Sequence, residues 1–399
     1  MRKERGFCLA LSFSLVAGAA LGQIDPDKRE LIQFGFTQAI EGASPVAAYG
    51  YYYLNEPGFF ATNTTLRLAL APVYMDSEVG FSKLLGPNTD VGLGLAGGGF
   101  ADNYYEFQEG KYIPGESFSG DSAENSVSVY HLFDPGKLIP LYGLVRVREH
   151  LSTYDKNDDY PGFVLPRNHW TTAWRAGLRL GGREPLLNPD LAGEISGWYE
   201  GQYRTGAGTY GLDNDARLES RSDLFWGRVL LIYTLPKSKQ RLEFSVTGGS
   251  SAHADRFSAY RLGGDLPLAT EFPLAIPGYF YQQLSAGSFV CANARYAVPL
   301  DPAKAWSLTP IGSVAEIDSI NGLDQPRRTF SGVGLELSYH SGNGVWQAGL
   351  LYGYGIDARP NDRDGQSIGI LCQINLEAHH PGGPSRLDQV MGYLPNHFW

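Results

Sequence analysis

The chain has 399 residues and a formal net charge of −10. An acidic chain carries no basic footprint for nucleic acid, and after residue 22 no run of about 18 apolar residues could form a transmembrane helix. The composition includes 50 Gly, 24 Tyr, 20 Phe and 7 Trp. Because Tyr and Trp rings collect at membrane–water interfaces, this composition favours a membrane β-barrel, although a secreted β-sandwich could share it.

The first residues have the features of an export signal. Three basic residues precede an apolar run at 6–20, and Ala20 and Gly22 frame a small-x-small cleavage site. We therefore predict a signal peptide over residues 1–22 and a mature protein outside the cytoplasm. Only Cys291 and Cys372 follow that segment, too few for a disulfide scaffold.

Alternation of apolar and polar residues predicts a series of strands of about ten residues. Sixteen are expected, an even number as single-chain bacterial barrels require. They lie at 29–41, 45–54, 64–73, 77–85, 89–100, 124–133, 139–153, 169–181, 192–204, 223–235, 240–250, 286–300, 306–318, 329–340, 345–356 and 366–377. The predicted fold class is all-β, a transmembrane antiparallel barrel over 23–377, followed by a C-terminal tail at 378–399, with no periplasmic domain in front.

The connections between these strands alternate in length. Short turns such as 235–240 and 341–344 alternate with long links such as 101–123 and 251–285. Short turns on one side and long loops on the other are typical of outer-membrane barrels. One link, at 182–191, is longer than the short-turn side predicts.

Alternation also assigns faces on single strands. Cys291, Asn293 and Arg295 should face the lumen, whereas Cys372 should share the lipid face with the isoleucines of the last strand. We thus expect both thiols to be free, because they lie on opposite sides of the wall. Glu316 and Asp318 share a face, which we expect to line the lumen, with Arg295 as one candidate partner. The alternative places them in water at the barrel mouth.

No motif points to chemistry. The G-x-G-x-x-G match at 92–97 lies inside a predicted strand with no helix after it, so a dinucleotide site is not expected. The eight histidines have no metal-ligand spacing, and the acidic residues Asp155, Asp158 and Asp159 are better explained as a solvated loop than as a cation site. No nucleophile elbow is present. We therefore expect no catalytic, cofactor or metal residues.

The region 257–377 carries three motifs in a characteristic order: Arg261-Leu262-Gly263-Gly264, then Ile276-Pro277-Gly278-Tyr279, then a strand at 293–300. In this order the chain resembles the BamA/TamA-type barrels, also called the bacterial surface antigen family. In that family a loop before the twelfth strand inserts an arginine-glycine-aromatic tip into the lumen, where it meets an acidic residue. Here Pro277 stands where the family has its arginine, so that ion pair cannot form in the usual way.

The resemblance implies a set of site residues. The lumen loop would comprise Arg261, Gly263, Gly264, Pro277, Gly278 and Tyr279, and the lumen wall Arg295, Glu316 and Asp318. Because eight apolar side chains between 266 and 281 would form a sticky patch in water, we predict that Leu274–Phe280 folds into the lumen, with Tyr279 against the inner wall near Glu316.

The implied role is structural or in outer-membrane assembly, or at the cell surface, without enzymatic activity. Its expected partners are outer-membrane lipids and other envelope proteins, not nucleic acid, and the barrel is expected to be monomeric. A passive, porin-like channel is the alternative, and an enzyme that modifies envelope lipids is the third hypothesis. The long loop at 257–285 distinguishes the first two, because a loop folded inward would close a channel.

Overall fold

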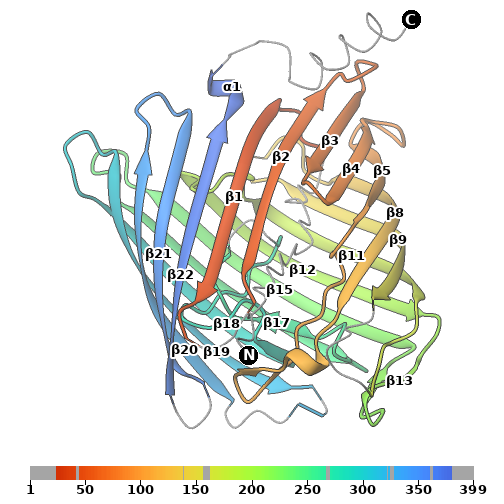
Figure 1. Ribbon diagram of the computed structural model, residues 1–399. Coiled ribbons are helices and arrows are strands. Elements are labelled where there is room, and N and C mark those ends of the chain that lie inside the picture. Colours follow the sequence, from red (N-terminus) through yellow and green to blue (C-terminus); the bar gives the residue numbers. More distant parts are fainter. Residues whose placement is uncertain are drawn as a thin grey trace, which may run out of the picture.

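The structure is a computed structural model that describes residues 24–41, 45–137, 139–155, 162–266, 270–320, 322–323, 328–359 and 363–379 (Figure 1). The predicted signal peptide and almost all of the predicted tail lie outside these residues. One 17-stranded antiparallel sheet dominates the described chain, and the short β17 (Tyr260–Leu262) adds to it beside β18. The other sixteen strands form the wall of a closed barrel.

The wall strands are β1 (Arg29–Ala39), β2 (Ala47–Pro57), β3 (Thr64–Leu70), β4 (Tyr74–Phe81), β5 (Thr89–Gly98), β8 (Ser119–Leu132), β9 (Leu141–Asp155), β11 (His169–Gly182), β12 (Leu191–Arg204), β15 (Arg221–Thr234), β16 (Arg241–Ala252), β18 (Leu284–Pro299), β19 (Trp306–Ser319), β20 (Thr329–His340), β21 (Trp346–Arg359) and β22 (Arg363–Asn375). The predicted transmembrane barrel is confirmed. The largest boundary differences are at β8, which begins five residues earlier than predicted, and at β4, which ends four residues earlier.

Smaller elements lie in the long connections, at the end of the barrel opposite α1 (Leu376–His379). They are β6 (Phe107–Gln108), β7 (Lys111–Tyr112), η1 (Pro114–Glu116), β10 (Phe163–Val164), β13 (Gly208–Leu212) and β14 (Ala216–Leu218). We call this the long-loop end and the other the short-turn end. In the described part of the chain, no helix has the length and apolar character needed to cross a membrane.

The barrel closes where its first and last strands meet. β1 pairs with β22 from Leu31↔Asn375 to Ala39↔Ser367 without a register shift. A closed sheet satisfies every backbone group internally, as the hydrocarbon of a bilayer requires. We call this β1–β22 junction the seam.

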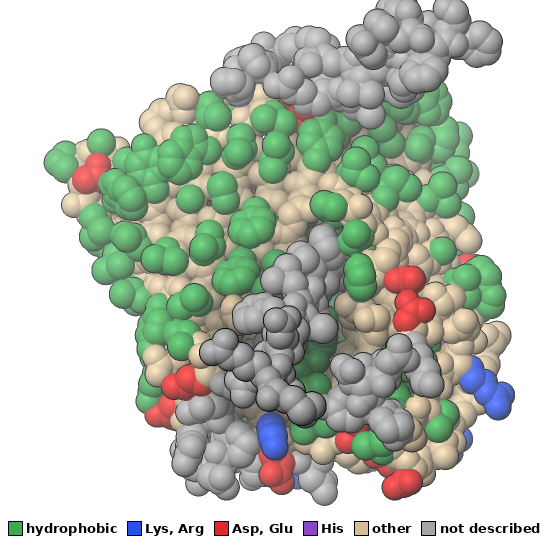
Figure 2. All heavy atoms as spheres, viewed as in Figure 1, with side chains coloured by type: hydrophobic (Ala, Val, Ile, Leu, Met, Phe, Trp, Pro, Cys, Tyr) green, Lys and Arg blue, Asp and Glu red, His purple; other side chains and the backbone are tan. Residues whose placement is uncertain are grey.

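The outer surface of the wall is apolar over most of its height (Figure 2). Outward side chains such as Ile195, Val333 and Leu350 are 52–58% exposed. Rows of aromatic rings border this band. At the short-turn end Trp306, Tyr339 and Trp346 stand 4.7–4.9 Å apart between ring centroids, and at the long-loop end Trp174, Tyr199 and Phe225 stand 4.7 Å apart. Such girdles mark the two membrane interfaces.

The two cysteines lie on opposite faces of the wall. Cys291 is fully buried on the lumen face, whereas Cys372 is half-buried on the outer face, in line with the exposed side chains of Ile368 and Ile370. Both are free. The predicted faces are confirmed, because a one-residue slip in either strand would have reversed them.

Candidate functional site

The connection from β16 to β18 turns into the barrel and occupies its lumen. Ile276 and Tyr279 are at most 1% exposed and pack with Cys291, Phe289 and Ile317, which project inward from β18 and β19. Leu274–Phe280 therefore lies inside the wall. We call the segment 263–283 the lumen loop.

Two glycines direct the chain into the lumen. Gly263 and Gly264 have positive φ angles of 130° and 46°, which favour glycine. The adjacent Arg261 donates hydrogen bonds to Ser285 Oγ and to the Tyr105 carbonyl, both at 2.7 Å. Arg261 thus fixes the entrance of the lumen loop rather than its tip.

The tip of the loop rests on glycines of the wall. A Cβ atom on Gly278, where φ is +83°, would lie 1.8 Å from the Gly355 nitrogen. A Cβ on Gly332 would lie 2.2 Å from the Pro277 carbonyl oxygen, and one on Gly365 would lie 2.6 Å from the Gly278 oxygen. Only glycine permits such a close approach of two backbones. We call Gly332, Gly353, Gly355 and Gly365, on β20–β22, the glycine bed.

Hydrogen bonds to the wall hold the tip in place. The Gly278 N–H donates to Ser367 Oγ at 3.1 Å, and the Tyr279 hydroxyl donates to the Ile356 carbonyl at 2.6 Å. The Tyr279 ring stands edge-on to Phe330, with 6.1 Å between centroids. The tip therefore recognises mainly the shape and the backbone of the wall.

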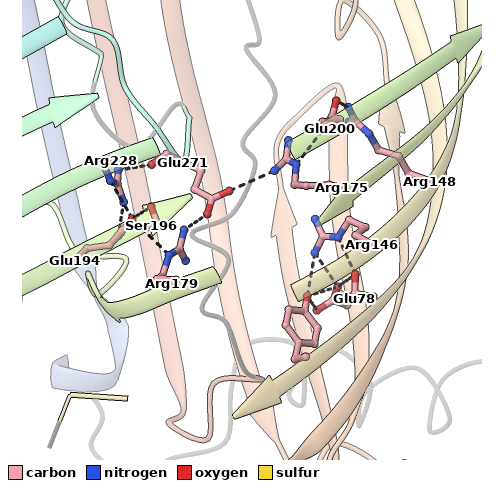
Figure 3. A network of polar contacts seen from close by, with 12 residues as sticks. Glu78, Arg146, Arg148, Arg175, Arg179, Glu194, Ser196, Glu200, Arg228 and Glu271 are labelled. Atoms are coloured by element: carbon pink, nitrogen blue, oxygen red, sulfur yellow. Dashed lines mark hydrogen bonds and ion pairs between the residues drawn. The ribbon is translucent and has the colours of Figure 1, made fainter. Parts of the chain in front are cut away.

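The first half of the lumen loop forms ion pairs and hydrogen bonds with arginines of β11 and β15, across the lumen from the glycine bed (Figure 3). The Glu271 carboxylate accepts a hydrogen bond from Arg179 and lies 3.5 Å from Arg175 Nη1, while its main-chain carbonyl accepts one from Arg228 at 2.8 Å. Glu194 pairs with two of the same guanidinium groups, at 2.5 Å to Arg228 and 3.5 Å to Arg179. We call this side, on β11, β12 and β15, the charged wall.

The row of ion pairs continues around the lumen away from the loop. Glu200 lies 2.8 Å from both Arg175 and Arg148, and Arg148 lies 3.3 Å from Glu124. Removal of one member of a buried pair leaves an uncompensated charge, which costs about 3–5 kcal/mol. The alternating signs therefore stabilise the wall only as a connected set.

Arg295 lies on the lumen wall, but its partners differ from the expected one. It pairs with Asp265 of the lumen loop at 2.9 Å and with Glu336 of β20. Burial raises the pKa of the Asp265 carboxyl, and Arg295 opposes that increase. The guanidinium thus joins the loop to the wall.

The prediction that Glu316 and Asp318 line the lumen is wrong. Both are exposed on the outward face of β19, like Val314, and Asp318 lies 3.4 Å from Arg328. The inward residues of β19 include Ala315 and Ile317, which pack against the lumen loop. Because the lumen loop packs against this end of β19, its inward face is apolar at Ala315 and Ile317, and polarity alone indicates the wrong face.

The mouth at the long-loop end is covered by other connections. Phe107 stacks on Phe280 at 5.4 Å, and Arg256 pairs with Glu106 at 3.1 Å. Tyr104 donates a hydrogen bond to Glu106, and burial raises the pKa of the Tyr104 hydroxyl far above its usual value, so that it remains a donor. The lumen loop is therefore enclosed by the barrel wall and covered at this mouth.

Sequence reasoning missed Glu271 and the glycine bed. The signal for the bed was present, as glycines at alternate positions 353 and 355 of β21 with an inward glycine on each neighbouring strand, at 332 and 365. Of the acidic cluster, Asp158 and Asp159 lie outside the described residues, and within the described ranges no group of three or more His, Cys, Asp or Glu side chains could hold a metal ion. The glycine-rich match at 92–97 lies within β5.

Solved structures of outer-membrane proteins share this architecture. CdiB from Acinetobacter baumannii aligns with a TM-score of 0.57 and 13% identity over 87% of this chain and 60% of that one. BamA from Haemophilus ducreyi lacking POTRA domains 1–3 aligns with a TM-score of 0.54 and 9% identity, over 87% and 71%. CdiB from Escherichia coli gives 0.55 and 12%, over 87% and 63%.

This chain has the fold of the BamA and CdiB barrels. It spans less than two thirds of the length of the two CdiB chains. No family model matches the sequence, and no curated protein matches it either. The likeness supports an outer-membrane β-barrel.

Proposed function

We propose that this protein is a non-enzymatic outer-membrane barrel that is closed at rest by its own lumen loop and that acts in the assembly or secretion of envelope components. The observation that carries the proposal is the position of the loop tip, with Gly278 against Gly355 in the glycine bed. Seated there, the loop packs its buried side chains Ile276 and Tyr279 in the space that an open channel would leave to water. The resemblance to BamA/TamA-type barrels supports the assembly role.

The contacts of the lumen loop predict that it does not leave the lumen spontaneously. Its displacement would separate Glu271 from Arg179 and Asp265 from Arg295, and each carboxylate is buried. Separation of such pairs costs several kcal/mol unless new partners replace them. Opening therefore requires a client or partner that replaces these contacts, which we expect to be another envelope protein, with lipid around a monomeric barrel.

A passive channel is the second candidate. The observation in its favour is the row of alternating arginine and glutamate side chains along the charged wall, which could select solutes if the loop moved aside. A cavity of about 230 Å³ between this wall and residues 270–274 of the loop leaves space for water. The two functions differ in whether the resting barrel conducts.

Conductance of the purified full chain in planar bilayers tests the proposal. We expect a silent or flickering trace from the intact protein and steady conductance when residues 266–282 are replaced by a short glycine-serine linker. The thiol of Cys291, now covered by Ile276 and Tyr279, should then react readily with maleimide. A matched deletion at the β13–β14 turn, around Asp213 and Asn214, should change neither readout.

Steady conductance from the intact protein, unchanged by the loop deletion, would contradict the closed barrel and favour the channel.

A further inference from the structure

The β11–β12 connection, residues 183–190, is longer than the turns that join β15 to β16 and β20 to β21 on the same side of the barrel. It also folds inward. Pro185 and Leu187 are buried, and Leu187 packs against Leu351 of β21 and Leu371 of β22. These strands lie across the lumen from β11 and β12, so the connection crosses the barrel at its short-turn end.

Three glutamines on adjacent strands receive this connection. Gln33 on β1, Gln373 on β22 and Gln347 on β21 form a lateral row, because Gln373 is the register partner of both others. The seam runs between the first two. Gln33 and Gln373 are at most 4% exposed, and buried amides of this kind require hydrogen-bond partners.

Each glutamine binds one residue of the connection. Gln33 Nε2 donates to the Pro185 carbonyl at 3.2 Å, and Gln373 Oε1 accepts from the Leu187 N–H at 3.0 Å. Gln347 Oε1 accepts from Asn188 Nδ2 at 3.1 Å. Gln33 thus donates to the connection, whereas Gln373 and Gln347 both accept from it, so each glutamine matches a different polar group of the connection.

The row is also bonded directly across the seam. Gln33 Nε2 donates to Gln373 Oε1 at 2.7 Å, so this oxygen accepts from both the opposite strand and the connection. On the far side, Asn188 Oδ1 accepts from Arg241 of β16 at 2.5 Å. The connection is therefore attached to both strands of the seam and to β16 of the wall.

We propose that residues 183–190 form a clasp that holds the seam closed from inside the lumen. Separation of β1 from β22 would pull Gln33 away from Gln373 and leave the clasp attached to only one of the two strands. The clasp acts at the short-turn end, whereas the lumen loop contacts β20–β22 near the long-loop end. The two devices touch where Leu186 packs in the same cluster as Leu266, but they bind different residues of the wall, and the clasp does not depend on the proposed transport role.

Hydrogen exchange of backbone amides in the full-length protein tests the clasp. We expect Leu187→Ala combined with Asn188→Ala to speed exchange in β1 and β22 by about tenfold, equivalent to about 1.4 kcal/mol, and to leave the β12–β15 pairing unchanged. Leu230→Ala is the matched control, because Leu230 is an equally buried leucine on β15, away from the seam.

A crosslink distinguishes opening of the seam from general loosening. Phe34 is the register partner of Cys372, and Cα atoms of paired strand residues lie within disulfide reach. We therefore add Phe34→Cys to the clasp variant and oxidise it, so that a disulfide with Cys372 joins β1 to β22. Hydrogen exchange at the seam should then return to the wild-type rate. Exchange that stays at the wild-type rate in the clasp variant would overturn the proposal, as would faster exchange in all strands alike or acceleration that the crosslink does not reverse.

Discussion

The two sides of the barrel hold the same loop by different means. On β20–β22 the glycine bed accepts the tip through backbone contact, and the fit depends on the absence of side chains. On β11, β12 and β15 the charged wall holds Glu271 through long arginine side chains. One contact is set by shape at van der Waals distance, whereas the other is set by charge and can adjust to small movements.

The difference indicates separate roles for the two halves of the loop. A contact without side chains tolerates no displacement, so the tip is either docked or released. Flexible arginines can follow a carboxylate over a short path and can exchange one partner for another. The charged wall therefore guides the loop, and the glycine bed fixes its final position.

The largest effect should come from an added methyl group at the tip. In Gly278→Ala the positive φ alone costs about 1–3 kcal/mol, and the new Cβ would clash with Gly355. We expect the tip to leave the bed, which channel-like conductance and rapid labelling of Cys291 would reveal. Gly197→Ala on β12 is the control, because nothing lies within 4 Å of its added Cβ. A silent Gly278→Ala barrel would contradict the role of shape.

A smaller effect should follow Glu271→Gln. The substitution keeps the shape but removes the charge that Arg175 and Arg179 share, and a hydrogen bond to a charged group contributes about 1.5–3 kcal/mol. We expect faster hydrogen exchange at 270–274 while the tip stays docked and Cys291 stays protected. The control Glu149→Gln makes the same charge change in a carboxylate that is bonded to Thr172. Release of the tip would show that charge, not shape, fixes the loop.

Tyr279→Phe should have a weaker effect. It removes the hydrogen bond to the Ile356 carbonyl, worth about 1 kcal/mol, but keeps the ring beside Phe330. Labelling of Cys291 should accelerate by about fivefold without steady conductance. The control Tyr352→Phe loses a comparable hydrogen bond to Gln366 on the outer face, and it should leave the labelling rate of Cys291 unchanged. Equally faster labelling in both variants would mean that the Tyr279 hydrogen bond has no specific part in docking the loop.

The smallest expected difference concerns the two native thiols. In liposomes Cys372 should resist charged maleimides but react with a lipid-soluble one, because it lies on the lipid face, whereas Cys291 should react slowly with both. Mass spectrometry should find no native disulfide between them. Rapid reaction of Cys291 with the charged reagent in the intact barrel would mean that the loop covers the wall less tightly than its packing indicates.

The fold was predictable from the sequence because one property, alternation, specifies strands and faces together. It located all sixteen wall strands and the faces of Cys291 and Cys372. It failed at Glu316, since alternation groups residues by face but does not say which face is inward. That choice rested on polarity, and the lumen loop makes the inward side of β19 apolar.

The partners in the site were less predictable, because they depend on contacts between distant segments. Glu271 meets Arg179 across 92 residues, and Arg295 meets Glu336 across 41. No local pattern distinguishes these carboxylates from others in the chain. The clasp left only one trace in the sequence, a turn that was too long.

The seam has a consequence for how the protein assembles. Gln33 and Gln373 are 340 residues apart in sequence, and contacts between such distant residues form slowly because a long chain must first be ordered. Most other strand pairs join neighbours in the chain and can form earlier. The lumen loop can therefore dock on β20–β22 while the sheet is still open. The last step of folding then brings Gln33 to the clasp and closes the wall without threading either segment through it.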